Sequence, residues 1–177
     1  LVPATGLQYD LAAHLLDQVI NLFGQPLNFY KILGKNRKGT KVDDYFHFHL
    51  EYPDSLQVFV CSSMLVPDPQ AAFVVHGEQG SLIKYRADTQ EAQLLKDIRP
   101  GSEGYGEEPD ELAATITRMN PDGSKRQEQL VSDTGSYMPL FDGVYQAIVN
   151  GTGYAVTEEQ VLTQLRILEA PAGFHRF

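Results

Sequence analysis

Apolar and polar side chains alternate strictly over residues 45–52, and this period of two constrains the fold more than any other feature of the sequence. The segment reads Tyr-Phe-His-Phe-His-Leu-Glu-Tyr, so its even-numbered residues are all apolar or aromatic. On a strand these residues share one face, and the other face carries Tyr45, His47, His49 and Glu51. Such a pattern is typical of an antiparallel strand with one buried face. The odd-numbered face is too polar for a core and apolar enough for an interface between subunits.

Further strand patterns follow this segment, and helical patterns occur towards both ends of the chain. Strands are predicted over residues 28–33, 56–61, 71–75, 81–85, 112–119 and 125–131. Helices are predicted over residues 7–23, 89–95, 138–150 and 157–170, with Thr89 as the expected N-cap of the second and a Thr157/Gln160 capping box at the last. A helix, then strands, then helices is not the βαβ alternation of a nucleotide-binding sheet. We therefore predict an α+β fold: an open, predominantly antiparallel β-sheet, formed as a meander, with helices packed on one face.

Length and charge exclude several classes of protein. A chain of 177 residues holds one substantial core, so residues 1–177 are expected to form a single domain. Its 14 Lys and Arg against 23 Asp and Glu give a net charge of −9, without the cationic excess that sequence-independent nucleic-acid binding needs. No apolar run approaches the ~20 residues of a membrane span. We expect a cytoplasmic protein with neither nucleic-acid nor membrane partners.

Two local features bear on the cysteine chemistry and on the extent of the chain. Cys61 is the only cysteine, which excludes an intramolecular disulfide and a cysteine-rich zinc module. It falls inside a predicted strand, where a buried and unreactive thiol is expected. The chain opens on Leu1-Val2-Pro3 without an initiator Met, so we expect it to be part of a longer protein.

The first predicted helix carries a polar stripe, Asp10, His14, Asp17 and Asn21, at steps of four, three and four. Residues four apart on a helix are neighbours, so the Asp10 carboxylate can lie beside the His14 imidazole. The carboxylate stabilises the imidazolium, which suits a group that accepts a proton from an alcohol and later returns it. The alternative is an ordinary solvated helix face, on which these residue types are also expected.

A metal site and a phosphate-binding loop are the other candidate constellations. His47 and His49 share a strand face with Glu51, and a metal there would need a further ligand such as His76 or Asp44. The alternative is an exposed or subunit-facing sheet surface, and no metal site is assigned. The glycine-rich run 101–106 lacks the preceding strand and following helix of a dinucleotide-binding fingerprint, so we reject it as a phosphate loop.

The segment Gly-Leu-Gln-Tyr-Asp-Leu-Ala-Ala-His-Leu-Leu-Asp-Gln, residues 6–18, resembles a known pattern. It is similar to the helix that opens the C-terminal domain of the Gfo/Idh/MocA oxidoreductases, the glucose-fructose oxidoreductase and inositol dehydrogenase family. The resemblance continues through residues 42–46, 80–85, 88–92 and 100–106 and so covers nearly the whole chain. The sequence departs from the pattern at Ala4-Thr5-Gly6, where two glycines are usual, and at Ala12 and Ala13, where one is usual.

The resemblance implies an NAD(P)-dependent oxidoreductase of two domains, of which this chain is the C-terminal one. NAD or NADP would be bound mainly by an N-terminal Rossmann domain, with no cofactor-binding residue in this chain. His14 would be the acid/base acting on a secondary hydroxyl of a sugar or polyol. Asp10 would orient His14 and accept a hydrogen bond from the substrate. Their cleft would be completed by the partner domain, which in the family also supplies a lysine, so the isolated chain is expected to be inactive.

The resemblance also implies a homodimer or tetramer formed through the open face of the sheet. The alternative to the enzyme is a non-catalytic binding or oligomerisation platform, in which the sheet face carries the whole function. In that case the helix with Asp10 and His14 is only a solvated surface.

Overall fold

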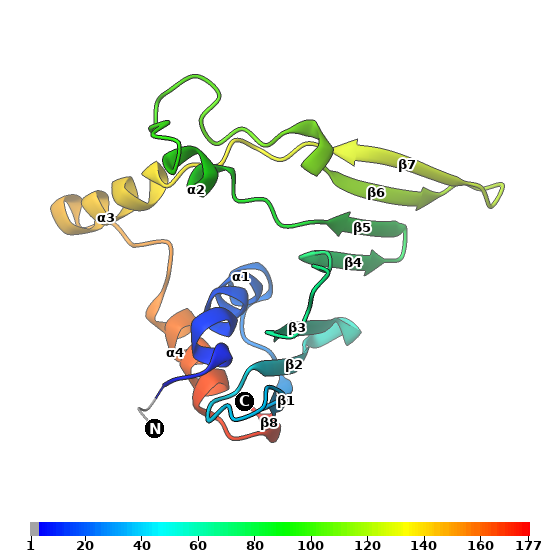
Figure 1. The fold of residues 1–177 in the computed structure, drawn as a ribbon, viewed down its shortest axis with the longest axis vertical. Helices are drawn as coiled ribbons and strands as arrows, with labels where there is room; N and C mark the ends of the chain where they lie inside the picture. Colours follow the sequence, from blue (N-terminus) through cyan, green and yellow to red (C-terminus); the bar gives the residue numbers. More distant parts are fainter. Residues whose placement is uncertain (1–3) are drawn as a thin grey trace. The chain divides into compact units, whose positions relative to one another are not determined.

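The computed structural model describes residues 4–177 (Figure 1). The opening Leu1-Val2-Pro3 lies outside the described residues. Two compact units are present, one formed by the residues up to Pro67 together with Tyr154–Phe177 and the other by Asp68–Gly153. Each contains one four-stranded sheet in which all paired strands are antiparallel. The predicted α+β class is confirmed.

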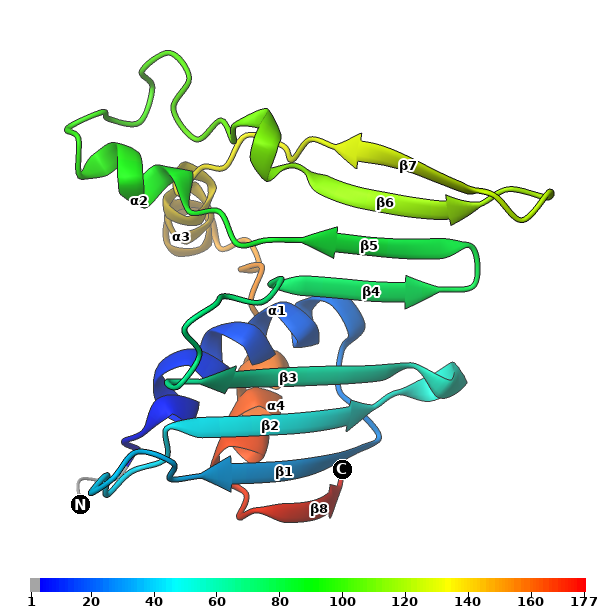
Figure 2. The same cartoon turned by 45° about the vertical axis from the view of Figure 1, so that its right-hand side comes forward.

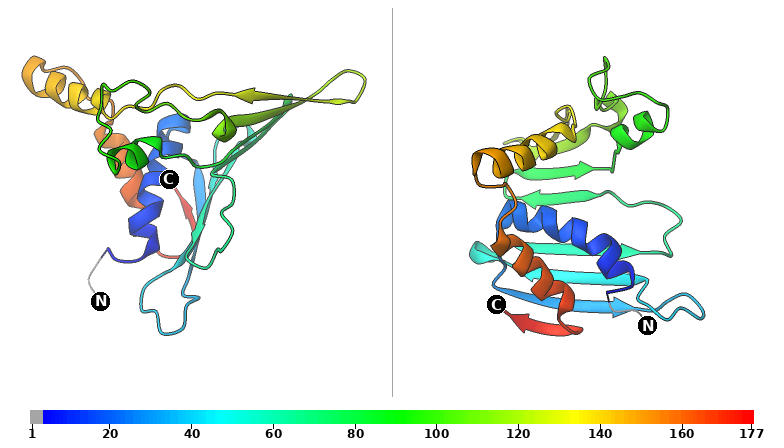
Figure 3. Two further views of the ribbon diagram at one scale, coloured as in Figure 1. Left: turned by 45° about the horizontal axis from the view of Figure 1, so that its top comes forward. Right: turned by 90° about the vertical axis from the view of Figure 1, so that its left-hand side faces the viewer.

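The sheet of the first unit has the strand order β3-β2-β1-β8. Its strands are β1 (Asn28–Gly34), β2 (Tyr45–Glu51), β3 (Gln57–Ser63) and β8 (Gly173–Arg176), and a short 3₁₀ turn, Pro53–Ser55, joins β2 to β3. Helices α1 (Ala13–Phe23) and α4 (Glu158–Glu169) lie on the same face of this sheet (Figures 2 and 3). The expected capping box at Thr157 and Gln160 begins α4. Helices therefore cover one face, as predicted.

The alternation in β2 decides where the core of this unit lies. Phe46, Phe48 and Leu50 are fully buried, whereas the odd-numbered residues of the strand are only half-buried. The buried residues of β2 form one cluster with apolar residues of α1, α4 and the neighbouring strands, among them Leu16, Ile20, Phe29, Val60 and Ile167. Burial of this apolar surface stabilises the unit and fixes the register, since a one-residue slip would turn the apolar set to the other face.

A buried lysine joins the sheet to the end of α4. Lys31 of β1 is 1% exposed, and its ammonium donates hydrogen bonds to the carbonyl oxygens of Ile167, Leu168 and Ala170 at 3.0, 2.7 and 2.8 Å. Carbonyl groups in the last turn of a helix lack partners within the helix, and a cation there is favoured by the helix dipole. Burial lowers the pKa of Lys31 to about 8, while the charge of Asp43 opposes this shift.

The sheet of the second unit has the strand order β4-β5-β6-β7. The elements of the unit are β4 (Phe73–Gly77), β5 (Gly80–Lys84), α2 (Thr89–Leu94), the 3₁₀ turn Asp110–Leu112, β6 (Ala114–Met119), β7 (Lys125–Leu130) and α3 (Met138–Asn150). The glycine-rich loop between α2 and β6 is anchored by a hydrogen bond that the Gly135 amide donates to the Gly106 carbonyl oxygen. A side chain at Gly106 would collide with the Gly135 carbonyl oxygen, so the loop closes there only with glycine.

Four expectations from the sequence are corrected. The C-terminal segment forms a strand that was not expected: β8 adds to the edge of β1 through the pairs Phe29–His175 and Tyr30–Phe174. The N-cap of α2 is Asp88 rather than Thr89, since the Asp88 carboxylate accepts the Glu91 amide. Cys61 is exposed rather than buried, because its position in β3 turns it away from the helices. The fourth correction is a π turn at the start of the first helix.

Candidate functional site

Asp10 and His14 both project from the first helical segment into solvent. Asp10 lies in a π-helical turn, η1 (Gln8–Ala12), and His14 lies in the first turn of α1, which continues from it. Both residues are exposed, as are Asp17 and Asn21 farther along the predicted polar stripe. The opposite side of the segment is buried through Leu7, Gln8, Ala12, Leu16 and Ile20. Asp10 and His14 are therefore both exposed on a helical segment whose other side is buried.

The π turn is the fourth correction, because a regular α-helix was expected over residues 7–23. A π turn inserts one extra residue into the helical repeat and appears frequently at functional sites. The residue pattern gave no sign of it, since apolar residues recur at steps of four at positions 11, 15 and 19 and again at 12, 16 and 20. Its position next to His14 singles out this segment from the other helices of the chain.

The described residues offer Asp10 and His14 no partner of their own. No hydrogen bond among residues 4–177 joins the two side chains. Neither side chain lines the cavity at Phe73 and Lys84 or the cavity at Gln25 and α4. The pair is thus open to groups that come from outside this chain. A cleft completed by another domain stays a prediction.

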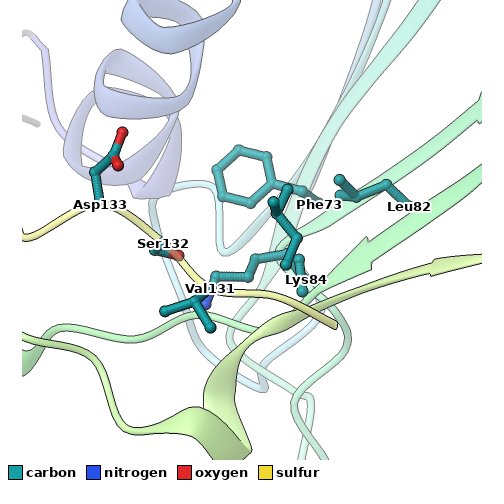
Figure 4. Close-up of a pocket in the computed structure, with 8 residues that line it drawn as sticks. Phe73, Leu82, Lys84, Val131, Ser132 and Asp133 are labelled. Carbon is teal, nitrogen blue, oxygen red and sulfur yellow. The ribbon is translucent and has the colours of Figure 1, made fainter. Parts of the chain in front are cut away.

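The second unit contains a cavity of about 350 Å³ (Figure 4). Phe73, Leu82 and the stem of Lys84 gather on one side of it, next to Val131, while Asp133 projects away from them. Ala114, Leu130 and Ser132 complete the lining. The walls are mostly apolar, and the amine of Lys84 is already engaged.

The Lys84 amine forms an ion pair with the largely buried Glu108 and donates to the Leu112 carbonyl oxygen at 2.5 Å. Burial opposes ionisation of Glu108, but hydrogen bonds from Lys84 and Ser132 hold the pKa of its carboxyl below the usual value. The Lys84 ammonium, at the end of β5, is therefore paired within the second unit and is not a free cation in the cavity. A second cavity of about 340 Å³ lies in the first unit between Gln25 and the beginning of α4.

The uncovered face of the first sheet carries the histidines considered for metal binding. His49 stacks on Phe59 with ring centroids 4.6 Å apart and shares a hydrogen bond with Gln57. The suggested further ligands are engaged elsewhere: His76 shares a hydrogen bond with Ser81 Oγ at 2.8 Å, and Asp44 accepts one from Arg37. Within residues 4–177, no three His, Cys, Asp or Glu side chains are grouped so that they could hold a metal ion.

The glycine-rich loop does not offer a phosphate cradle. It follows helix α2 rather than a strand, and its last glycine lies against the carbonyl of Gly135 instead of facing open space. No described helix has the length and apolarity to cross a membrane.

Comparison with known proteins shows relatives over almost the whole chain. The family model described as "Oxidoreductase family, C-terminal alpha/beta domain" matches residues 2–172. The uncharacterised oxidoreductase YhhX of Escherichia coli is 36% identical over 168 residues, which are 95% of this chain and 48% of that protein. The scyllo-inositol 2-dehydrogenase (NADP(+)) IolW of Bacillus subtilis is 32% identical over 167 residues, 94% of this chain and 46% of that protein. The chain thus spans about half the length of these relatives.

Solved structures give the same result for the fold. The crystal structure of the probable oxidoreductase yhhX superposes with a TM-score of 0.86 at 34% identity, covering 99% of this chain and 52% of that one. An oxidoreductase from Bacillus cereus gives a TM-score of 0.89 at 32% identity, covering 99% and 61%. With the family model matched almost from end to end, the chain belongs to the C-terminal α/β domain family of the Gfo/Idh/MocA oxidoreductases.

Proposed function

We propose that the complete protein containing this chain is an NAD(P)-dependent oxidoreductase acting on a secondary hydroxyl of a polyol or sugar, and that Asp10 and His14 serve that reaction. The observation that carries the proposal is the exposure of Asp10, in the π turn, and of His14, in the first turn of α1, on one helical segment of a chain of this family. The polyol is suggested by IolW, named a scyllo-inositol 2-dehydrogenase that uses NADP(+).

In this mechanism His14 takes the hydroxyl proton as the alcohol becomes a ketone and returns it in the reverse direction. Asp10 orients the imidazole, stabilises it when it is protonated and accepts a hydrogen bond from a second substrate hydroxyl. A nicotinamide, which would be bound mainly by residues outside this chain, supplies the hydride acceptor. Because this cofactor would be bound mainly by another domain, we expect the isolated 177-residue chain to be inactive.

The experiment is a substrate panel on the complete protein. Scyllo-inositol, myo-inositol, D-glucose and D-xylose are each offered with NAD⁺ and with NADP⁺, and reduced nicotinamide is measured by its absorbance. The proposal expects turnover of at least one polyol or sugar. Absence of turnover across the panel in both directions contradicts it and favours the binding or oligomerisation platform.

We also propose that a second copy of the protein covers the open face of the first sheet. Three aromatic side chains of this face, Tyr30, Phe59 and Phe174, are 46%, 60% and 53% exposed. They belong to one row across the strands with His49, through the pairs Tyr30–Phe174, Tyr30–His49 and His49–Phe59. Aromatic residues are enriched at protein interfaces, and a two-fold axis places one such patch against its own copy.

Cys61 gives a direct test, because it is exposed on this face beside His47. In the complete protein, we expect sedimentation as a dimer or larger assembly and slow maleimide labelling of Cys61 under native conditions. Phe59→Glu places a charge in the aromatic row and should yield a smaller species with rapidly labelled Cys61. Leu95→Glu, at an 83% exposed position after α2, is the matched control and should change neither property. A monomeric wild-type protein with a fast-reacting Cys61 contradicts the proposal.

A further inference from the structure

The helical segment that bears Asp10 begins without a cap of its own. Its N-cap residue, Leu7, makes no side-chain capping bond. Asp43, which is buried and 35 residues away from Gln8, takes this role: its carboxylate accepts the Gln8 amide at 2.8 Å, and its main-chain carbonyl accepts the Leu7 amide at 2.9 Å. A carboxylate is favoured at a helix N-terminus because it satisfies an unpaired N–H group and meets the positive end of the dipole.

Gly6 shows how closely this arrangement is fitted. It has a φ of +111°, and its carbonyl oxygen accepts the amides of Tyr9 and Asp10 at 3.2 Å each. A Cβ atom at this position would lie 2.1 Å from Asp43 Oδ1. Any larger residue would therefore displace the Asp43 carboxylate. Glycine at position 6 is therefore needed for the Asp43 carboxylate to reach the start of the helical segment that carries Asp10 and His14.

A second contact holds the other end of the π turn. Gln164 of α4 donates a side-chain hydrogen bond to the carbonyl of Ala13, the residue directly before His14. Asp43 and Gln164 thus bind the backbone on both sides of residues 8–12. A π turn is rare on its own, so it needs constraints of this kind from the surrounding structure.

We propose that Asp43 and Gln164 are positioning residues that hold the π turn and thereby set the relative placement of Asp10 and His14. The inference rests on the proposed function, because neither residue would touch the substrate. A misplacement of about 1 Å at a reacting group can cost about 100-fold in rate. Loss of either contact should therefore lower kcat while leaving the rest of the fold in place.

The experiment compares Asp43→Ala and Gln164→Ala with neighbours that serve other segments, all in the complete protein. Asp44→Asn is the control for Asp43: Asp44 is also buried, but its carboxylate accepts the Asn36 and Arg37 amides at 2.7 and 2.8 Å and so holds the loop at residues 35–41. Gln160→Ala is the control for Gln164, since it removes the capping box of α4 without touching Ala13. Asp43→Asn is the conservative variant, because its side-chain oxygen can still accept a hydrogen bond from the Gln8 amide.

Two readouts are measured on each variant. Hydrogen exchange of the peptide covering residues 7–14 should speed up about tenfold or more in Asp43→Ala and Gln164→Ala, as expected when about 1.4 kcal/mol of local stability is lost. With the best polyol of the panel, kcat should fall about 10- to 100-fold, and the primary deuterium isotope effect on kcat should rise because hydride transfer becomes slower. Asp44→Asn and Gln160→Ala should leave both readouts near wild type, and Asp43→Asn should restore most of the protection and of kcat.

The outcomes separate this inference from the proposed function. Unchanged exchange at residues 7–14 in Asp43→Ala and Gln164→Ala, or equal effects in the two controls, overturns the positioning role. Faster exchange with an unchanged kcat and isotope effect also overturns it, because the turn would then be held for stability alone. If no polyol or sugar is turned over, the proposed function fails by itself, and exchange still decides whether the two residues hold the turn. If Asp43→Ala does not fold, Gln164→Ala and Asp43→Asn carry the test.

Discussion

Replacing His14 with alanine in the complete protein should lower kcat for polyol oxidation by about 10²- to 10⁴-fold, the usual contribution of a positioned acid/base. The physical reason is that the hydroxyl proton then has no acceptor at the reacting oxygen, while hydride transfer would build positive charge on the substrate. Because His14 is exposed on the helix surface, the substitution removes no core contact and should leave stability nearly unchanged. The measurement is steady-state turnover as a function of pH, with the melting temperature recorded alongside.

Two other carboxylates of the same helical segment, Asp10 and Asp17, provide variants to compare with His14→Ala. Asp10→Asn keeps the shape of the side chain but loses its charge, so we expect a smaller fall in kcat than in His14→Ala and a rise in KM from the weakened hydrogen bond to substrate. Asp17→Asn changes a carboxylate on the same exposed stripe one turn beyond His14 and should have no effect on either constant. Undiminished kcat in His14→Ala would refute the acid/base role and favour a solvated helix face.

Replacing Lys31 with methionine should destabilise the first unit by about 2 kcal/mol or more at pH 7. Methionine has nearly the same length, so the packing of the stem is kept. The carbonyl oxygens of Ile167, Leu168 and Ala170, however, lose the donor that holds them at the end of α4. A buried carbonyl left without a partner costs about 1–3 kcal/mol. Relief from burying the ammonium offsets part of this loss, which is why we expect less than the sum for three bonds.

The pH dependence of this effect has a definite sign. Burial lowers the pKa of Lys31 to about 8 in the folded protein, against 10.5 as its ordinary value, so the unfolded chain binds more protons between these two pH values. The free energy of unfolding should therefore rise from about pH 8 towards pH 10, by up to about 3 kcal/mol, and this rise should be absent in Lys31→Met. The gap between wild type and variant thus widens with pH.

Urea unfolding followed by circular dichroism at pH 7, 8 and 9.5 measures both predictions on the same samples. Measurements stay below pH 10, because burial raises the pKa of Tyr52 to about 12, and the stability that this tyrosine contributes is lost between pH 10 and 12. Leu22→Ala, at a 66% exposed position near the end of α1, is the control and should shift all three midpoints equally. Parallel pH profiles for wild type and Lys31→Met would refute the buried-lysine account.

The predictions from sequence succeeded where a local pattern decides the structure. The period of two in β2 predicted its buried and open faces, and the Thr157/Gln160 pattern located the start of α4. The order of elements gave the α+β class. The prediction of a regular helix over residues 7–23 was wrong at its start, because steps of four fit an α-helix and a π turn equally well at this length. The prediction that the Cys61 thiol is buried was also wrong. One face of β3 is open, and Cys61 lies on that face.

The amino-acid order by itself determined most of the elements, the buried face of β2 and the Asp10–His14 spacing, because each depends on residues a few positions apart. The tertiary structure decided what depends on distant residues: the pairing of β8 with β1, the burial of Lys31 against α4, and the contacts of Asp43 and Gln164 with the site helix. These contacts join residues 35 to 151 positions apart, across which no periodicity or cap pattern acts. Only the packed chain brings their backbone and side-chain groups within hydrogen-bond distance.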